Sequence, residues 1–344
     1  MQIPIQNIYY ILCYAWNKLD EKDIVDVDIS KNTDIYNLFA RIIISGISRL
    51  FKRGADREYI EFDEDLPGLK GKINFKETIK KNLFIKGKIN CSYDELDYDV
   101  IQNQILKAIT KILLGYTELE AKHKDDLILI HQRFHNITDI NLTNKSFSKV
   151  KLHRNNYFYD FLLKICELIF DNLLVSEEKG KSKFRDFLQD DIKMRAVFEE
   201  FLRNFYKLEQ YEFKVYRENI TWNIIPENEL GKNFLPEMQT DISLESNSRK
   251  IIMDAKYYSN IFTIGQFGKE IFHPPNLYQL FSYLKNIESK GGLNKNCAGV
   301  LIYPEVNNAI DQKYQMENHS LRIATINLMD DWEKINENLL RIIT

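Results

Sequence analysis

Hydrophobic residues follow helical spacing over most of the first half of the chain. From Ile5 to Trp16 they recur at positions i, i+3, i+4 and i+7, which predicts a buried amphipathic helix. The same spacing predicts further helices at residues 36–51, 97–115, 122–134 and 156–174. Around the Leu66-Pro67-Gly68 turn, from residue 59 to residue 93, apolar and polar residues alternate instead, which predicts short antiparallel strands.

A polar, charged segment with one glycine, residues 175–183, is predicted to be a linker. The segments after it alternate between helical and strand-like patterns. Helices are expected at 184–208, after Pro274-Pro275 and at 330–343, and strands at 212–217, 221–225, 240–245, 250–258, 298–303 and 321–328. This order is typical of an α/β sheet domain. We therefore expect a mixed α/β protein, with a mixed α+β domain at residues 1–176 and a sheet domain at residues 184–344.

The composition of the 344 residues, 44% hydrophobic and 28% charged, excludes a disordered chain. No apolar run reaches the roughly 18–20 residues of a membrane helix, and the start of the chain lacks the features of a secretory signal. Four widely separated cysteines form no C-x-x-C pair, so we expect reduced thiols in a soluble cytoplasmic protein; they are Cys13, Cys91, Cys166 and Cys297. The net charge of −3 means that any contact with nucleic acid must come from a local patch.

Two aspartates occupy matching places in a predicted hairpin of the second domain. Asp254 interrupts an apolar strand, and Asp241 begins the strand before it. If the hairpin turns tightly at Asn247-Ser248, its register places Asp241 directly opposite Asp254, with Cβ atoms about 4.5–5.5 Å apart. Like charges in this arrangement destabilise a sheet unless a cation lies between them. The pattern therefore predicts a metal site.

The expected ion is Mg²⁺, with Mn²⁺ as an alternative, because hard cations prefer oxygen ligands and bind through one or two carboxylates plus substrate phosphate. Such an ion neutralises charge at a scissile phosphate and lowers the pKa of a bound water. Lys256 follows Asp254 on the same strand face, where it can orient or deprotonate that water or stabilise the developing oxyanion. Next to a cation, its pKa is expected to fall.

The wider arrangement resembles the core of the PD-(D/E)xK nucleases. An aspartate is followed by an apolar run, an Asp-x-Lys tripeptide, and a helix with Gln279 and Tyr283 four residues apart. The resemblance implies that these two residues support the site or contact the DNA backbone. The strand position of Ala255 allows its carbonyl to be a further metal ligand. The resemblance also implies a glutamate from the first helix of the domain. Glu199 is our choice and Glu200 the alternative. In one respect the chain departs from the pattern, because Thr240 rather than proline precedes Asp241.

Motifs along nearly the whole chain resemble the McrC family, the nuclease subunit of 5-methylcytosine-dependent McrBC restriction systems. They are Ile3-Pro-Ile-Gln-Asn-Ile-Tyr-Tyr-Ile-Leu-Cys-Tyr-Ala-Trp16, Gly71-Lys-Ile-Asn-Phe75, Cys91-Ser-Tyr-Asp-Glu95, Asn103-Gln-Ile-Leu-Lys107, Phe198-Glu199, Thr240-Asp241-Ile242 and Asp254-Ala-Lys-Tyr-Tyr258. The resemblance implies a first domain that docks on a hexameric AAA+ GTPase, McrB, and stimulates its hydrolysis. It implies a second domain that cuts DNA after GTP-driven translocation, while the partner recognises the modified base.

The first domain contains a lysine-rich segment between Leu69 and Asn90, in which Glu77 is the only acidic residue. One interpretation is a basic hairpin that enters the pore of a ring or contacts DNA phosphates, and the other is a solvated hairpin. An arginine of this domain is a candidate contributor to the partner's GTPase site, with four equivalent choices: Arg41, Arg49, Arg53 and Arg57. The chain has no P-loop sequence, so we do not expect it to bind GTP itself, and His131 and His135 lack the carboxylate of a zinc motif.

These observations lead to the hypothesis of a Mg²⁺-dependent DNA endonuclease subunit. Asp241, Asp254 and the Ala255 carbonyl are the expected metal ligands, Glu199 assists them, and Lys256 acts on the attacking water. Two alternatives remain open at this point. One is an autonomous nuclease or repair enzyme with the same core, and the other is a non-catalytic adaptor that activates a ring GTPase.

Overall fold

The computed structural model describes residues 3–17, 35–154, 156, 158–177, 191–224, 234–258 and 260–344. The chain forms two compact units, one of residues Met1–Asn32 and Arg185–Thr344, the other of Thr33–Phe184. Both contain helices and sheets, as expected for a mixed α/β protein. The boundary at residue 184 lies where the second domain was predicted to begin. The assignment of the first 32 residues to the first domain is wrong, because they belong to the unit of the C-terminal sheet.

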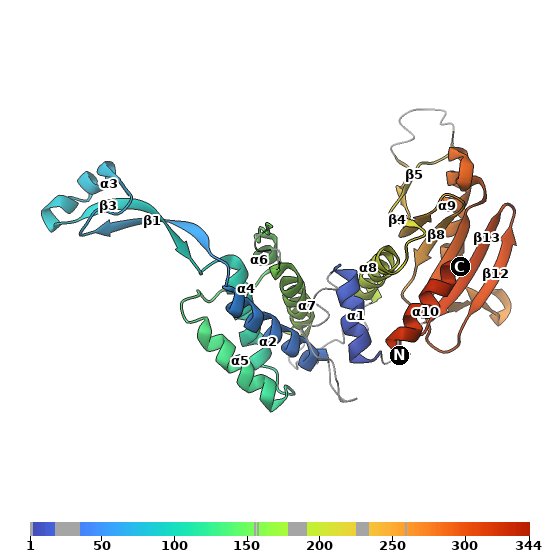
Figure 1. Cartoon of the computed structure of the whole chain (residues 1–344), viewed down its shortest axis with the longest axis horizontal. Coiled ribbons are helices and arrows are strands. Elements are labelled where there is room, and N and C mark those ends of the chain that lie inside the picture. The colour runs from blue at the N-terminus through green and yellow to red at the C-terminus, as the bar shows by residue number, and fades with distance from the viewer. Residues whose placement is uncertain are drawn as a thin grey trace. The chain divides into compact units, whose positions relative to one another are not determined.

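The inserted unit, residues 33–184, is a group of helices from which a long arm projects (Figure 1). Its helices are α2 (Ile35–Arg53), α4 (Ile101–Leu114), α5 (Ala121–Arg133), α6 (Asn144–Ser148) and α7 (Tyr159–Glu177). Four of these agree with the predicted helices, whereas α6 was not predicted. The predicted linker begins inside α7, and its residues 178–183 lie outside the described part of the chain.

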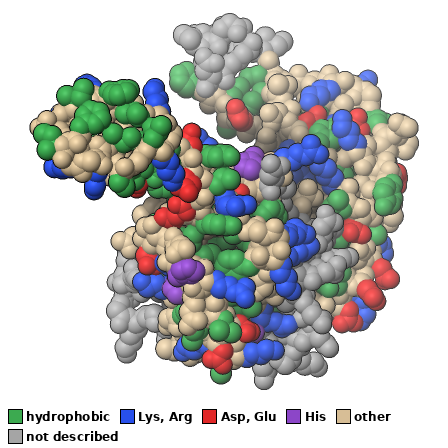
Figure 2. Space-filling view, turned by 60° about the vertical axis from the view of Figure 1, so that its left-hand side comes forward, with side chains coloured by type: hydrophobic (Ala, Val, Ile, Leu, Met, Phe, Trp, Pro, Cys, Tyr) green, Lys and Arg blue, Asp and Glu red, His purple; other side chains and the backbone are tan. Residues whose placement is uncertain are grey.

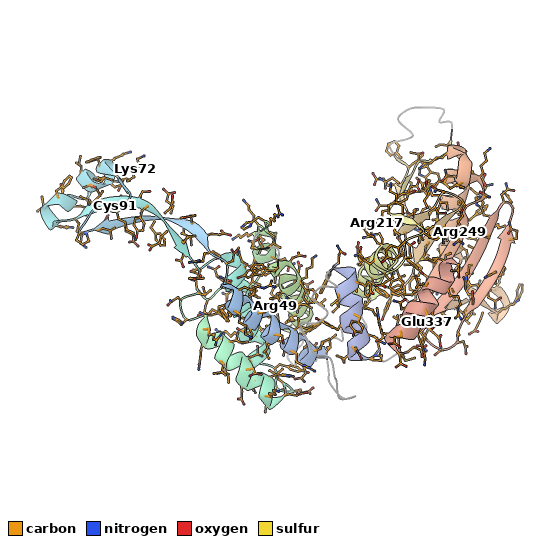
Figure 3. All side chains as sticks on the ribbon, in the orientation of Figure 1. Arg49, Lys72, Cys91, Arg217, Arg249 and Glu337 are labelled. Carbon is orange, nitrogen blue, oxygen red and sulfur yellow. The ribbon has the colours of Figure 1, made fainter. Side chains whose placement is uncertain are left out.

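The arm consists of β1 (Glu58–Leu66) and β3 (Ile89–Asp97), paired antiparallel over their whole lengths, with the short β2 (Lys72–Ile73) beside β3. Helix α3 (Phe75–Lys80) and the 3₁₀ helix η2 (Leu83–Lys86) form its tip. Figure 3 labels Lys72 and Cys91 within this arm. The predicted antiparallel strands are confirmed, but the two helical turns between them were not predicted. Gly71, which precedes β2, has a φ of +67°, and a Cβ there would lie 2.5 Å from the Ser92 carbonyl oxygen.

The larger unit is built on a six-stranded sheet with the order β12-β13-β11-β8-β7-β4. Strands β8 (Lys250–Ala255), β11 (Ala298–Pro304) and β13 (His319–Ile326) run parallel, and β4 (Lys214–Tyr216), β7 (Ile242–Glu245) and β12 (Asp311–Met316) pair antiparallel with their neighbours. Every residue of β8 is buried. Because successive side chains point to opposite faces, both faces of the sheet are covered at this strand.

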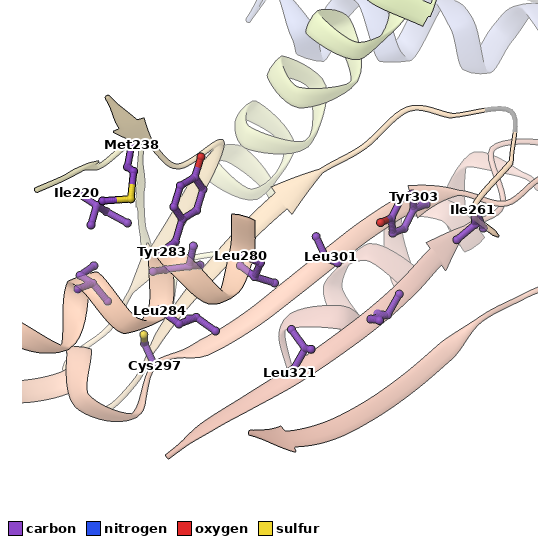
Figure 4. Close-up of a cluster of buried hydrophobic side chains, with 13 residues drawn as sticks. Ile220, Met238, Ile261, Leu280, Tyr283, Leu284, Cys297, Leu301, Tyr303 and Leu321 are labelled. Carbon is purple, nitrogen blue, oxygen red and sulfur yellow. The ribbon is translucent and has the colours of Figure 1, made fainter. Parts of the chain in front are cut away.

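Helices α8 (Asp191–Glu209), α9 (Pro274–Ile287) and α10 (Trp332–Ile343) pack on this sheet. Side chains of α9 form one buried cluster with Ile252, Leu301 and Ile323 of the strands (Figure 4). Two further short pairs complete the unit: β5 (Asn219–Ile220) with β6 (Met238–Gln239), and β9 (Phe262–Ile264) with β10 (Glu270–Phe272).

Several predicted bounds in this unit need correction. The strand expected at 221–225 is instead the short β5, residues 221–224 are not in a strand, and residue 225 lies outside the described residues. Strands β6, β9, β10 and β12 were not predicted. Of the helix expected at 184–208, residues 184–190 lie outside the described part and the remainder is α8.

Helix α1 (Ile5–Ala15) belongs to the sheet unit because its buried face and its polar groups both find partners there. The Asn7 amide donates hydrogen bonds to the carbonyl oxygens of Leu328 and Asp330, at 2.9 and 2.8 Å. The Tyr14 ring stacks on Trp332 with 5.5 Å between centroids, and its hydroxyl donates to Glu209. The helix itself was predicted correctly, but its partner was not.

All four cysteines are buried and none forms a disulfide. Within the described ranges, no helix is both long enough and apolar enough to cross a membrane.

Candidate functional site

The β7–β8 hairpin confirms the predicted register. Its turn is closed by the Ser246 backbone amide, which donates to the Arg249 carbonyl oxygen at 2.9 Å, leaving Asn247 and Ser248 at the tip. Ile242 pairs with Met253 and Glu245 with Lys250. The residue before β7, Asp241, therefore comes opposite Asp254. One Asp241 oxygen, Oδ2, accepts a hydrogen bond of 2.9 Å from the Ala255 amide, which fixes this carboxylate against the end of β8.

Asp254 is a buried carboxylate whose side chain is only 1% exposed. Its Oδ2 lies 2.8 Å from the Lys256 ammonium nitrogen in an ion pair, whereas Oδ1 accepts no hydrogen bond. Burial raises the pKa of Asp254, Lys256 opposes this effect, and Asp241 adds to it. A buried carboxylate with unused acceptor oxygens is costly unless a cation compensates it.

Lys256 is held between the carboxylates and helix α9. In addition to its ion pair with Asp254, its Nζ donates to Gln279 Oε1 at 3.0 Å, and Gln279 Nε2 donates to the Tyr283 hydroxyl at 2.8 Å. Helix α9 begins with Pro274 and Pro275 in its first turn, as predicted, and this start sets the positions of both side chains. The structure thus brings Gln279 and Tyr283 into one hydrogen-bonded chain with Lys256.

The pKa of Lys256 shifts opposite to the prediction. Burial lowers it, but the Asp254 carboxylate outweighs burial, and the pKa is raised above its ordinary value. The predicted fall assumed a neighbouring cation. In the arrangement of side chains alone, the nearest charge is a carboxylate, which stabilises the ammonium.

Glu199 on α8 faces this cluster. Burial raises its pKa, and so does the Asp241 carboxylate, whereas Lys256, Arg217 and Arg195 act in the opposite direction. Its neighbour Glu200, the alternative choice, forms ion pairs with Arg203 and, at 3.3 Å, with Arg217. Glu199 is therefore the better candidate of the two.

The side chains of the site supply only some of the oxygen ligands that a divalent ion needs. Asp254 offers Oδ1, which accepts no hydrogen bond, and Asp241 keeps Oδ1 beyond its bond to Ala255. Among the residues that the structure describes, no three His, Cys, Asp or Glu side chains are already gathered as a metal site. This donor set fits Mg²⁺, which keeps several waters and needs few protein ligands. The ligand role of the Ala255 carbonyl stays a prediction.

The family model for the McrBC 5-methylcytosine restriction system component matches residues 6–304. This chain belongs to that family. The match begins in α1, and it includes both aspartates, Lys256, Glu199 and the Gln279–Tyr283 pair. It ends at β11, so β12, β13 and α10 lie beyond it.

Two McrBC proteins show how far the similarity extends. The chain is 31% identical over 340 residues to the type IV methyl-directed restriction enzyme EcoKMcrBC of Escherichia coli (strain K12), covering 99% of this chain and 97% of that protein. Its fold resembles a chain in the tetradecameric assembly of Thermococcus gammatolerans McrB AAA+ hexamers with bound McrC. That match has a TM-score of 0.62 and 15% identity, and it covers 99% of this chain and 75% of that chain.

Two arginines beside the candidate site were not predicted from the sequence. Arg217 follows β4 (Figure 3) and reaches Glu199 Oε2 at 3.7 Å. Arg195 lies one helical turn before Glu199 on α8, and its guanidinium carbon lies 5.3 Å from the centre of the Tyr258 ring. The proximity of Arg195 to Glu199 could have been predicted from the sequence, because residues four apart share one helix face. The position of Arg217 could not have been predicted in this way, because it depends on how β4 pairs with β7.

Proposed function

We propose that this chain is the nuclease subunit of an McrBC-type restriction complex and that it hydrolyses phosphodiester bonds in DNA with a bound divalent cation. Its larger unit would be a PD-(D/E)xK nuclease domain. The observation that carries the proposal is the position of Asp241, which the register of the hairpin places opposite the buried Asp254, with Lys256 two residues further on and ion-paired to Asp254. A buried ion pair is weak evidence of a purely stabilising role, and a second carboxylate opposite it adds repulsion, so a functional role is favoured.

Asp241, Asp254 and the Ala255 carbonyl would hold Mg²⁺ or Mn²⁺, with Glu199 assisting. When bound, the cation supplies charge neutralisation at the scissile phosphate and acidifies a coordinated water. An ammonium group has three donors. Lys256 directs two of them to Asp254 and Gln279, so the third is left for the attacking water or a phosphate oxygen. Gln279 and Tyr283 hold the ammonium in this position.

We also propose that the inserted unit docks on a McrB-like AAA+ GTPase hexamer and stimulates its hydrolysis. The related fold in Thermococcus gammatolerans is bound to McrB hexamers. In this chain, the tip of the arm exposes large apolar side chains together with lysines (Figure 2). They are Leu69, Phe75, Ile79, Phe84 and Ile85, which are between 58% and 86% exposed. A patch of this kind is typical of a protein-binding surface. The partner would recognise the methylated base.

The nuclease role is tested by cleavage of methylated plasmid DNA with the partner, GTP and Mg²⁺. Asp254→Ala and Lys256→Met should each lower the cleavage rate by at least about a hundredfold, because even outer residues of metal sites contribute about 10–100-fold. Lys250→Met is the matched control. Lys250 is also buried on β8, but it pairs with Glu218 at 2.7 Å, at the other end of the strand.

The three functions predict different outcomes. The proposed subunit requires that Asp254→Ala still folds, binds the partner and stimulates its GTPase while cleavage is lost. Cleavage by the chain without any partner would instead identify an autonomous nuclease. Unchanged restriction by Asp254→Ala, with GTPase stimulation intact, would identify a non-catalytic adaptor.

A further inference from the structure

A short hairpin rises from the end of the sheet that carries the candidate site. Strand β8 ends at Ala255, directly after Asp254, and the chain then forms β9 and β10 before it returns as α9. Each strand of the hairpin has three residues, so its tip stands about 10 Å beyond its base. Both ends of the hairpin therefore connect to segments that carry site residues. Lys256 lies before the hairpin, and Gln279 lies after it on α9.

Ring contacts fix the base of this hairpin to the site. His273, the residue before α9, lies with its ring centre 5.3 Å from that of Tyr258, and its Nε2 lies 3.0 Å from the Asn260 carbonyl oxygen. The Tyr258 ring also contacts the guanidinium group of Arg195. Arg195 shares its helix face with Glu199. The base of the hairpin is thus held by residues that also lie around the carboxylates.

Within the hairpin, the strands are held together by an aromatic pair and a tight loop. The rings of Phe262 and Phe272 are 5.1 Å apart across the two strands. The Gly265 amide donates to the Lys269 carbonyl oxygen at 2.8 Å, which closes the loop around residues 266–268. The loop is therefore ordered by its own contacts rather than by the rest of the unit.

The tip residue, Phe267, is unfavourable in two respects. Its side chain is 98% exposed, so its ring stabilises nothing within the chain. Its backbone also has a φ of +69°, a conformation that disfavours residues with a Cβ. Glycines flank the loop at 265 and 268, yet position 267 itself carries a large ring. Strained and exposed apolar residues of this kind occur mainly where they serve a function.

On the basis of the proposed function, we propose that the β9–β10 hairpin is a DNA-contacting element whose Phe267 ring inserts against the bases of the duplex beside the cut position. If the carboxylates act on a phosphodiester bond, the duplex must pass this end of the sheet. Lys269, two residues after Phe267, is exposed and carries the charge that a DNA phosphate attracts. Apolar wedges that enter a groove and partly unstack base steps are an established mode of DNA contact.

The experiment measures binding of the full chain to a short duplex by fluorescence anisotropy, without a divalent cation so that no strand is cut. Duplexes with 2-aminopurine at successive positions report unstacking. Phe267→Ala should weaken binding roughly tenfold, the contribution typical of one aromatic–base stack, and abolish the 2-aminopurine signal. Phe267→Trp should retain both. Phe267→Gly should bind as weakly as Phe267→Ala without a fall in Tm, because it also relieves the backbone.

Tyr211→Ala is the matched control. Tyr211 is also 98% exposed, but it precedes β4 at the opposite end of the sheet, where Lys214 pairs with Glu245 next to the β7–β8 turn. This variant should bind and unstack DNA as the unaltered chain does. A similar loss in Tyr211→Ala would show that any exposed ring gives the effect, and would overturn the proposal.

Other outcomes separate the hairpin from the proposed function. If the unaltered chain cuts DNA with its partner but Phe267→Ala binds and unstacks DNA equally well, only the hairpin proposal fails. Loss of partner binding by Phe267→Ala at unchanged DNA affinity would assign the hairpin to a protein contact instead. If the unaltered chain neither binds nor cuts DNA under any of these conditions, both proposals fail.

Discussion

Under the proposed function, a divalent cation stabilises the unit of residues 1–32 and 185–344, and replacing Asp254 by asparagine should remove that stabilisation. The change keeps the shape of the side chain and removes its charge. Asp254 is buried, forms an ion pair with Lys256 through Oδ2, accepts no hydrogen bond at Oδ1 and lies opposite Asp241. An asparagine there does not repel Asp241, and because its amide oxygen is neutral it holds a divalent cation much more weakly than a carboxylate does.

The size of the effect follows from the geometry of the pair. Two unit charges about 5 Å apart repel each other by about 3 kcal/mol at an effective dielectric constant of about 20. A bound cation removes this repulsion. Linkage gives a similar figure, because a ligand at about 100 times its Kd stabilises the folded state by about 2.7 kcal/mol. For a unit of this size, that corresponds to a rise in Tm of roughly 5–10 °C.

The assay is differential scanning calorimetry of the full chain, freed of metal with a chelator and then titrated with Mg²⁺ or Mn²⁺. The two units are expected to unfold in separate transitions, and the shift should appear in the larger one. Asp311→Asn is the control, because it makes the same change of charge in the same unit. Asp311 pairs with Arg322 at 2.7 Å on the edge of the sheet, so this variant should keep the full response to metal. A full shift in Asp254→Asn, or none in the unaltered chain with either cation, would refute the reasoning.

Two further predictions concern the inserted unit. Tyr159→Phe should destabilise it by about 2–4 kcal/mol in urea unfolding, because a partly buried and a buried group lose their hydrogen bonds to the hydroxyl. They are the Asp56 amide, at 2.8 Å, and Asn103 Oδ1, at 2.7 Å. An unchanged midpoint would contradict this. Burial favours neutral Asp99, but hydrogen bonds from Thr138 outweigh burial and hold the pKa of Asp99 below its ordinary value. The contribution of Asp99 to stability is therefore complete above the unfolded pKa of about 4 and is lost as the pH falls through the lower folded pKa. Asp99→Asn should flatten the decline of stability measured between pH 6 and pH 3. An equally steep decline in this variant would contradict the prediction.

The part of the site on the β7–β8 hairpin was predictable because local rules determine it. A two-residue turn fixes which residues pair, and a shift by one residue would turn the apolar side chains of β8 to the wrong face. The positions of Asp241, Asp254 and Lys256 follow from this register. Gln279 and Tyr283 were predictable for a similar reason, since residues four apart share a helix face.

The parts that were not predictable depend on contacts between distant segments. The spacing of α1 shows that one face is buried, but nothing in it shows what covers that face. Its partners are α8 and α10, and the bond from Asn7 reaches a residue 321 positions away. Strands β9 and β10 have three residues each, too short for an alternating pattern to be recognised. The sign of the Lys256 shift depended on which charge is nearest, which spacing alone does not give.

The corrected position of α1 changes how the two proposed activities are connected. The chain begins in the larger unit, forms the inserted unit and then returns, so the inserted unit is joined to the rest through α1 and α8. These two helices are bound to each other: the Asn204 amide of α8 donates to the carbonyl oxygens of Tyr14 and Ala15 at 2.9 and 3.1 Å. Helix α8 also carries Glu199. Under the proposed function, a force that a GTPase ring exerts on the inserted unit therefore reaches the larger unit at α1 and at α8, the helix that carries Glu199.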